Sequence, residues 1–192
     1  MPDDSDRILT ITSVLQAPVQ AVYAAWTQPE HMRHWFGPNG FSVFACEMDA
    51  RAGGRWRVGM TAPQGTEHVE LGTVCEVVPL ERLVLTPAWL RDDGKPGHET
   101  TITVALAGEN DVTRMTFRQG TFESVKSRDE HNDGWSSAFA LLAEHLLGIA
   151  SPESLGRPGA VSELIQHARP HLDALRAQVA AKSKPAPKKP DA

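Results

Sequence analysis

The segment 133–147 (DGWSSAFALLAEHLL) carries the clearest helical pattern in the chain and limits the folds that the chain can adopt. Its large apolar residues recur at helical spacing: Trp135, Phe139, Leu142 and Leu146. This spacing places them on one face of a helix, and Asp133 is expected to cap the first turn. Because nearly everything before this segment reads as strand, the simplest architecture is one long helix packed against a curved sheet.

Short β-type segments fill most of the chain before that helix. They alternate in polarity or are rich in β-branched residues, and hairpin-sized turns separate them, which predicts a meandering antiparallel sheet. The expected strands cover residues 7–15, 41–48, 55–60, 67–78, 82–89, 100–107 and 112–118. Two short helices are expected after the first strand. One starts at Ala17-Pro18, and the other is capped by Thr27, with Glu30 completing a capping box.

The chain divides into one domain and a C-terminal addition. Its 192 residues allow one sizeable core plus an appendage. We expect a flexible N-terminus at 1–6, a single domain at 7–148, an amphipathic helical extension at 149–181 and a disordered Lys/Pro/Ala tail at 182–192. The apolar stripe of the extension needs a partner surface, either its own domain or a second copy of the chain in a homodimer.

The composition argues against several classes of function. The net charge of −5 and the pI near 5.9 give no basic surface for nucleic acid. No apolar run is long enough to span a membrane, and the acidic N-terminus does not resemble a secretory signal. The two cysteines, Cys46 and Cys75, lack metal-ligand spacing, so a reducing, cytoplasmic location is expected. No glycine-rich phosphate loop is present, and no cofactor is expected.

Two pairs of titratable residues have spacings that could support chemistry. His31 and His34 are three residues apart on a short predicted helix, but no third metal ligand adjoins them in the sequence, so we expect them at the surface. Glu67 and Glu70 fall on opposite faces of their strand because side chains alternate with a period of two. They therefore do not form an acid–base pair, and no metal site or catalytic residue is assigned.

A set of short motifs occurs in the order found in one known family. It comprises Ala17-Pro18, Trp26, Thr27-x-Pro29-Glu30, Trp35-Phe36-Gly37-Pro38, Asp49-x-Arg51-x-Gly53-Gly54, Glu76-Val77-Val78-Pro79, Glu81-Arg82-Leu83 and Gly134-Trp135. Together, over about residues 7–147, these motifs resemble the activator of heat-shock-protein-90 ATPase homologue family, in the START-like (SRPBCC) superfamily. The resemblance implies an α+β helix-grip fold, a curved antiparallel sheet of about seven strands around a long C-terminal helix.

The resemblance also implies a range of functions. Many relatives bind greasy molecules in an apolar cavity between sheet and helix, a few are cyclases or hydrolases, and the eponymous domain stimulates a chaperone's ATPase. We therefore expect a non-enzymatic protein that binds a small hydrophobic molecule, such as a lipid, polyketide or aromatic metabolite. The alternatives are a cyclase- or hydrolase-type enzyme that acts in the cavity, and a chaperone-interacting ATPase activator module.

The residues expected to line this cavity are the inward-facing aromatic and apolar side chains of the sheet and helix. They are Trp56, Val58, Met60, Trp89, Phe117, Trp135 and Phe139. The competing interpretation is that these side chains fill the core. The expected polar anchors are His68, His98, Arg114 and Arg118. The two histidines belong beside strands at the cavity mouth, and either arginine could hold a ligand carboxylate.

Overall fold

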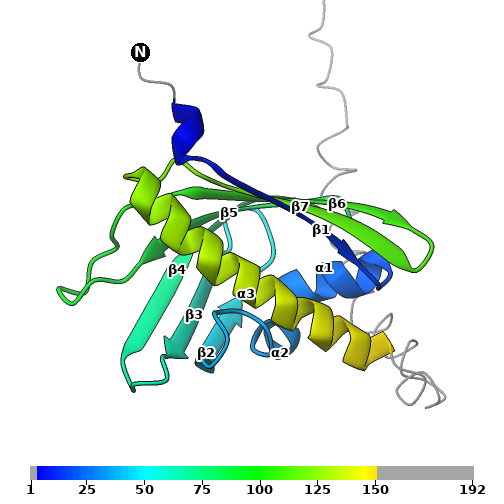
Figure 1. Cartoon of the computed structure of the whole chain (residues 1–192), viewed down its shortest axis with the longest axis horizontal. Helices are drawn as coiled ribbons and strands as arrows, with labels where there is room; N and C mark the ends of the chain where they lie inside the picture. The colour runs from blue at the N-terminus through cyan, green and yellow to red at the C-terminus, as the bar shows by residue number, and fades with distance from the viewer. Residues whose placement is uncertain (1–3, 151–192) are drawn as a thin grey trace, which may run out of the picture.

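The computed structural model of the chain describes residues 4–150 as a curled antiparallel sheet that wraps around one long helix (Figure 1). A 3-10 turn, η1 (Asp4–Arg7), precedes β1 (Leu9–Leu15), α1 (Val19–Thr27) and α2 (Pro29–Met32). The meander follows as β2 (Ser42–Met48), β3 (Arg55–Thr61), β4 (Glu67–Val78), β5 (Arg82–Trp89), β6 (Thr101–Glu109) and β7 (Val112–Gly120). Helix α3 (Val125–Ala150) ends the described part, so the predicted extension and tail from residue 151 on lie outside it.

The seven strands form one sheet in the order β1-β7-β6-β5-β4-β3-β2, and every neighbouring pair is antiparallel. Register shifts at Val43/Ala45 and at Val74/Glu76 mark irregularities in the β2–β3 and β4–β5 pairs. Such bulges bend a strand and increase its twist, which helps the sheet to curl around α3. The predicted α+β helix-grip fold is confirmed. None of the described helices is long and apolar enough to cross a membrane.

The centre of the molecule is a cluster of aromatic rings contributed by helices and strands together. Trp26 of α1 lies with its ring centroid 4.8 Å from that of Trp35 and about 6 Å from those of Phe117, Trp135 and Phe139. All five side chains are buried. Burial of each large side chain contributes about 2–3 kcal/mol, so this cluster holds α1, β7 and α3 together.

Two predicted helix starts are wrong. Helix α3 begins at Val125 rather than near Asp133, because Ser124 caps it by accepting a hydrogen bond from the backbone N–H of Ser127 at 3.1 Å. Its first two turns are mostly polar, so they carry no apolar periodicity. The proposed cap Thr27 is instead the last residue of α1. Its hydroxyl donates to the carbonyl of Tyr23 at 2.8 Å, which is the back-bonding typical of a residue inside a helix.

The cap at Ser124 gives a first testable prediction. Ser124→Ala should lower the free energy of unfolding by about 1 kcal/mol, because it leaves one N–H at the start of α3 without its acceptor. Urea unfolding followed by circular dichroism measures this loss. Ser136→Ala, at an exposed position in the middle of α3, is the matched control and should cost nothing. Equal losses in the two variants would contradict the assignment of the cap.

A histidine cluster joins α2 to the last third of α3. His31 Nδ1 lies 3.2 Å from His145 Nε2, and the rings of His34 and His145 stack at 5.0 Å. No third ligand adjoins His31 and His34 in the sequence, and the fold brings His145 to them. Within residues 4–150, no group of histidine, cysteine or acidic residues has the arrangement of a metal site. Burial, and then the neighbouring His31 and His34, lower the pKa of His145 to about 4.

This cluster should make the fold sensitive to acid. Between about pH 6.5 and pH 4, His145 is protonated in the unfolded chain but not in the folded chain. The contribution of this residue to stability is therefore lost as the pH falls. As the pH falls over that range, the free energy of unfolding of His145→Gln should rise by about 1–2 kcal/mol relative to that of wild type. This figure allows for the partial exposure of the histidine. Denaturant unfolding at several pH values tests it. The exposed His68→Gln is the control, and a flat difference for His145→Gln would contradict the prediction.

Candidate functional site

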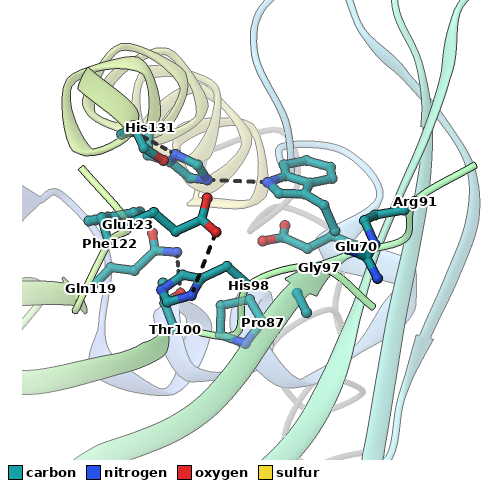
Figure 2. Close-up of a pocket in the computed structure, with 13 residues that line it drawn as sticks. Glu70, Pro87, Arg91, Gly97, His98, Thr100, Gln119, Phe122, Glu123 and His131 are labelled. Atoms are coloured by element: carbon teal, nitrogen blue, oxygen red, sulfur yellow. Dashed lines mark hydrogen bonds and ion pairs between the residues drawn. The ribbon is translucent and has the colours of Figure 1, made fainter. Parts of the chain in front are cut away.

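A pocket of about 250 Å³ opens at one end of the curled sheet (Figure 2). Its walls come from β4, β5 and β7, from the loop between β5 and β6, and from the start of α3 together with the segment before it. Apolar side chains, among them Pro87, Trp89 and Phe122, alternate with polar ones around it. Pockets with apolar walls and a few converging polar groups are the usual form of small-molecule sites.

Glu70 on β4 is the most unusual residue of this pocket. It pairs with Val58 on β3 and with Trp89 on β5, which places it on the concave face of the sheet. Its side chain is only 3% exposed, and its carboxyl group points towards the middle of the pocket (Figure 2). Burial alone raises its pKa to about 8, so the group keeps its proton at neutral pH. None of the described lysines, arginines or histidines forms an ion pair with it.

A buried chain of hydrogen bonds forms another part of the pocket wall, at Gln119 and Thr100. Trp135 Nε1 of α3 donates to Gln119 Oε1 at 2.6 Å, and Gln119 Nε2 donates to Thr100 Oγ1 at 2.9 Å. These bonds fix the orientation of the Gln119 amide, with its oxygen towards α3. They also tie α3 to β7 and to Thr100, which directly precedes β6, so this wall of the pocket is rigid before any ligand arrives.

His131 of α3 holds a further part of the pocket wall. Trp89 Nε1 donates to His131 Nε2 at 3.2 Å, and His131 Nδ1 lies 2.8 Å from the carbonyl oxygen of Ser127. These contacts require a proton on Nδ1 and a free pair on Nε2, which is a neutral imidazole. Nearer the rim, His98 Nε2 donates to the carbonyl of Thr121 at 2.8 Å. The two histidines thus shape the pocket and are already hydrogen bonded.

The predicted cavity residues divide between the core and the pocket. Trp89 alone of the seven lines the pocket, with 38% of its surface exposed. The other six lie in the buried core cluster: Trp56, Val58, Met60, Phe117, Trp135 and Phe139. Phe117 and Trp135 lie with ring centroids 4.6 Å apart, so these two side chains pack against each other within the core. Of the seven residues, Trp89 is therefore the one that the structure brings to the pocket described above.

The predicted polar anchors divide in the same way. His98 lines the pocket. His68 is exposed nearby, with its ring 6.2 Å from that of Trp89. The structure does not bring Arg114 and Arg118 to the pocket, because alternation along β7 turns their neighbours inward and leaves both arginines on the exposed face.

Glu70 had no assigned role in the sequence, although a signal for it was present. Glu70 lies two residues after His68 on β4, so the two side chains point to the same face of the sheet. The strand pairing puts both on the face that carries Trp56, and His68 is expected at the cavity mouth. A carboxylate on an inward face is rare enough to mark a site candidate. The prediction that Glu67 and Glu70 lie on opposite faces of the strand is confirmed, since Glu67 is exposed and Glu70 is buried.

Comparisons with known proteins agree with this architecture. The family model described as Activator of Hsp90 ATPase homolog 1-like protein matches residues 16–147. None of the curated proteins matches the chain in sequence.

Two similar solved structures share 26% identity with the chain. The match to a protein from Chromobacterium violaceum has a TM-score of 0.64 and covers 72% of this chain and 96% of the other chain. The match to a protein from Nitrosomonas europaea has a TM-score of 0.66 and covers 78% of this chain and 99% of the other chain. An AHSA1 protein from Silicibacter pomeroyi, at 23% identity and a TM-score of 0.67, covers 72% and 96% and supports the fold alone.

Proposed function

Because the chain belongs to the Activator of Hsp90 ATPase homolog 1-like family, we propose that it is a ligand-binding module that takes a small, largely apolar molecule in the Glu70 pocket. The family's START-like fold suggests a ligand-binding or activator module. The pocket favours the first of these, because the walls combine apolar surface with a few fixed polar groups. The activator alternative rests on the family's name alone.

The observation that carries the proposal is the buried carboxyl group of Glu70. A polar group removed from water without a hydrogen-bond partner costs free energy, and such groups are rare in folded proteins. The burial of Glu70 has no compensating ion pair among the described residues, yet its carboxyl group faces an open pocket rather than packed side chains. A ligand that meets this group offsets the cost and gains specificity from it.

The size of the pocket narrows the class of ligand. At about 250 Å³ it lies at or below the lower end of the range for drug-sized ligands, roughly 300–1,000 Å³. A single ring with one short substituent fits this space, whereas a long acyl chain or a folded polyketide does not. Of the ligands expected from the sequence, an aromatic metabolite is the one that the pocket favours.

The indole N–H signals of the tryptophans provide a direct test. Trp89 Nε1 donates to His131 at the pocket, whereas Trp35 Nε1 donates to the carbonyl of Ala25 inside the core at 2.9 Å. In ¹H–¹⁵N spectra of the full chain, titration with phenol, benzyl alcohol, benzamide, benzylamine and benzoate should shift the Trp89 signal with at least one of them. The Trp35 signal should stay in place. If no compound shifts Trp89, or if both signals move together, the pocket is not the binding site.

Catalysis is a second candidate, supported by the protonation state of Glu70. A carboxylic acid with a pKa of about 8 can give a proton to a bound substrate and take one back near neutral pH. Hydrolysis of phenyl acetate by wild type and by Glu70→Gln would test this. A wild-type rate no higher than that of the variant would remove the hydrolase reading and leave binding as the function.

A further inference from the structure

The charges around the pocket leave the Glu70 carboxyl group without a cation. Arg91 lines the rim, but its Nε lies 3.6 Å from Asp93 Oδ1, and its side chain is 58% exposed. It is therefore paired on the solvent side, where ion pairs are weak and screened. Glu123, which also lines the pocket, adds a second carboxylate with 69% of its side chain exposed.

The histidines near Glu70 do not supply the missing charge either. Both ring nitrogens of His131 are engaged in a pattern that requires the neutral form. His98 Nδ1 lies 4.0 Å from Glu123 Oε1, so this nitrogen faces the carboxylate of Glu123 rather than that of Glu70. His68, on the same strand face as Glu70, is exposed to solvent. Every described titratable group at the pocket other than Glu70 thus has another partner or lies in water.

The pocket around Glu70 suits a positively charged ligand with an apolar body. A buried carboxylate is costly unless it is paired, and the cost is recovered best by an opposite charge placed beside it. The ring of Trp89, which pairs with Glu70 between β4 and β5, stands next to this position, and Phe122 lines the same pocket. Aromatic faces attract ammonium groups. An anionic ligand would meet the Glu123 carboxylate and, once the pH passes the pKa of Glu70 near 8, a second carboxylate at Glu70. A neutral ligand would gain one hydrogen bond and leave the carboxyl group uncharged.

We propose that the pocket binds a small organic amine in its ammonium form, with the charged nitrogen against the Glu70 carboxylate and an aromatic or short aliphatic body between Trp89 and Phe122. This inference rests on the proposed function, since it names the ligand class of the same pocket. Binding ionises Glu70 and releases its proton, so the proton leaves for solvent as the ion pair forms. The affinity should therefore rise with pH until Glu70 is ionised in the free protein.

The test compares benzylamine, benzyl alcohol and benzoate, three probes of similar size that differ in charge. Titrations of the full chain follow the Trp89 indole signal between about pH 6 and pH 8. At the upper end benzylamine should bind at least about tenfold more tightly than benzyl alcohol, and its affinity should rise by up to about tenfold per pH unit. Benzoate should not bind. Glu70→Gln should bring the benzylamine and benzyl alcohol affinities to within about threefold of each other.

The outcomes separate this inference from the proposed function. If benzyl alcohol binds at Trp89 as tightly as benzylamine, or if the benzylamine affinity does not change with pH, the amine assignment is wrong while the pocket still binds small molecules. If none of the three probes shifts Trp89, the amine assignment is wrong, and the proposed function fails with it when phenol and benzamide also give no shift. An unchanged Trp35 signal in Glu70→Gln shows that the variant is folded. A benzylamine preference that survives this substitution would also overturn the assignment.

Discussion

Glu70→Gln is expected to make the protein more stable at neutral pH. The change in the free energy of unfolding caused by this substitution should be about 3 kcal/mol more favourable at neutral pH than in acid. The reason is the raised pKa of the buried carboxyl group, about 8 against an ordinary value of 4.5. Below the ordinary value both the folded and the unfolded chain hold the proton. As the pH rises the unfolded chain releases it first, so the contribution of Glu70 to stability is lost progressively up to about pH 8. Glutamine keeps the shape and removes this loss.

The measurement is denaturant unfolding of wild type and variant at about pH 4.5, 7 and 8.5. The difference between them should grow with pH and level off above the pKa of Glu70. A constant cost of burying the amide does not affect this growth, because it is the same at every pH. Glu67→Gln, on the exposed face of the same strand, is the matched control and should show no such trend. A pH-independent difference for Glu70→Gln would show that the carboxyl group is not desolvated.

Phe117→Ala is expected to cost about 3–5 kcal/mol of folding free energy. Phe117 on β7 is fully buried, and its ring lies 4.6 Å from that of Trp135 and 5.2 Å from that of Phe139. Truncation leaves a cavity between the sheet and α3 that three neighbouring rings cannot easily fill. The thermal midpoint and the urea midpoint should both fall, with a loss that is a large part of the stability of a domain of this size.

Phe44→Ala is the matched control for this loss. Phe44 lies on β2, an edge strand, with half of its surface exposed, and its ring rests on Gly59 of β3. The same chemical change there removes little buried area and should cost no more than about 1 kcal/mol. Comparable losses in the two variants would contradict the placement of Phe117 in the centre of the core.

The strand pattern explains why the fold could be predicted from the sequence. Alternation in the segment 55–60 identified the inward face of β3 correctly, since Trp56, Val58 and Met60 are all buried. Hairpin-sized connections left few possible strand orders, and a meander was the simplest of them. The start of α3 escaped prediction because its first turns face solvent. Periodicity of apolar residues reports only the buried part of a helix.

The position of the pocket could not be predicted in the same way. Alternation tells which side chains point inward, but the rings that α1 and α3 bring into the interior decide which of these are core. Trp26 fills the space beside Phe117 and Trp135, and no local pattern in the strands indicates this. The three-residue spacing between Glu67 and Glu70 excludes a carboxylate pair, but it does not reveal that Glu70 alone is a carboxyl group on an inward face.

Glu70 links the stability of the protein to its proposed function. A buried carboxyl group that lowers stability at neutral pH is a poor choice for a core, and glutamine or an aliphatic residue would serve the fold better. Natural sequences depart from good packing chiefly at functional sites, where a group is held ready for a ligand. The stability gained on replacing Glu70 and the binding lost should therefore appear in the same variant.

The most direct test of this account is the titration of Glu70 itself. In protein with ¹³C-labelled glutamate carboxyl groups, the Glu70 signal is the one absent from Glu70→Gln, and its chemical shift can be followed from about pH 4 to pH 10. The account predicts a midpoint near 8 in the free protein. A midpoint near the ordinary value of 4.5 would show a carboxylate that is solvated or already paired, and it would contradict the proposal that this group awaits a ligand.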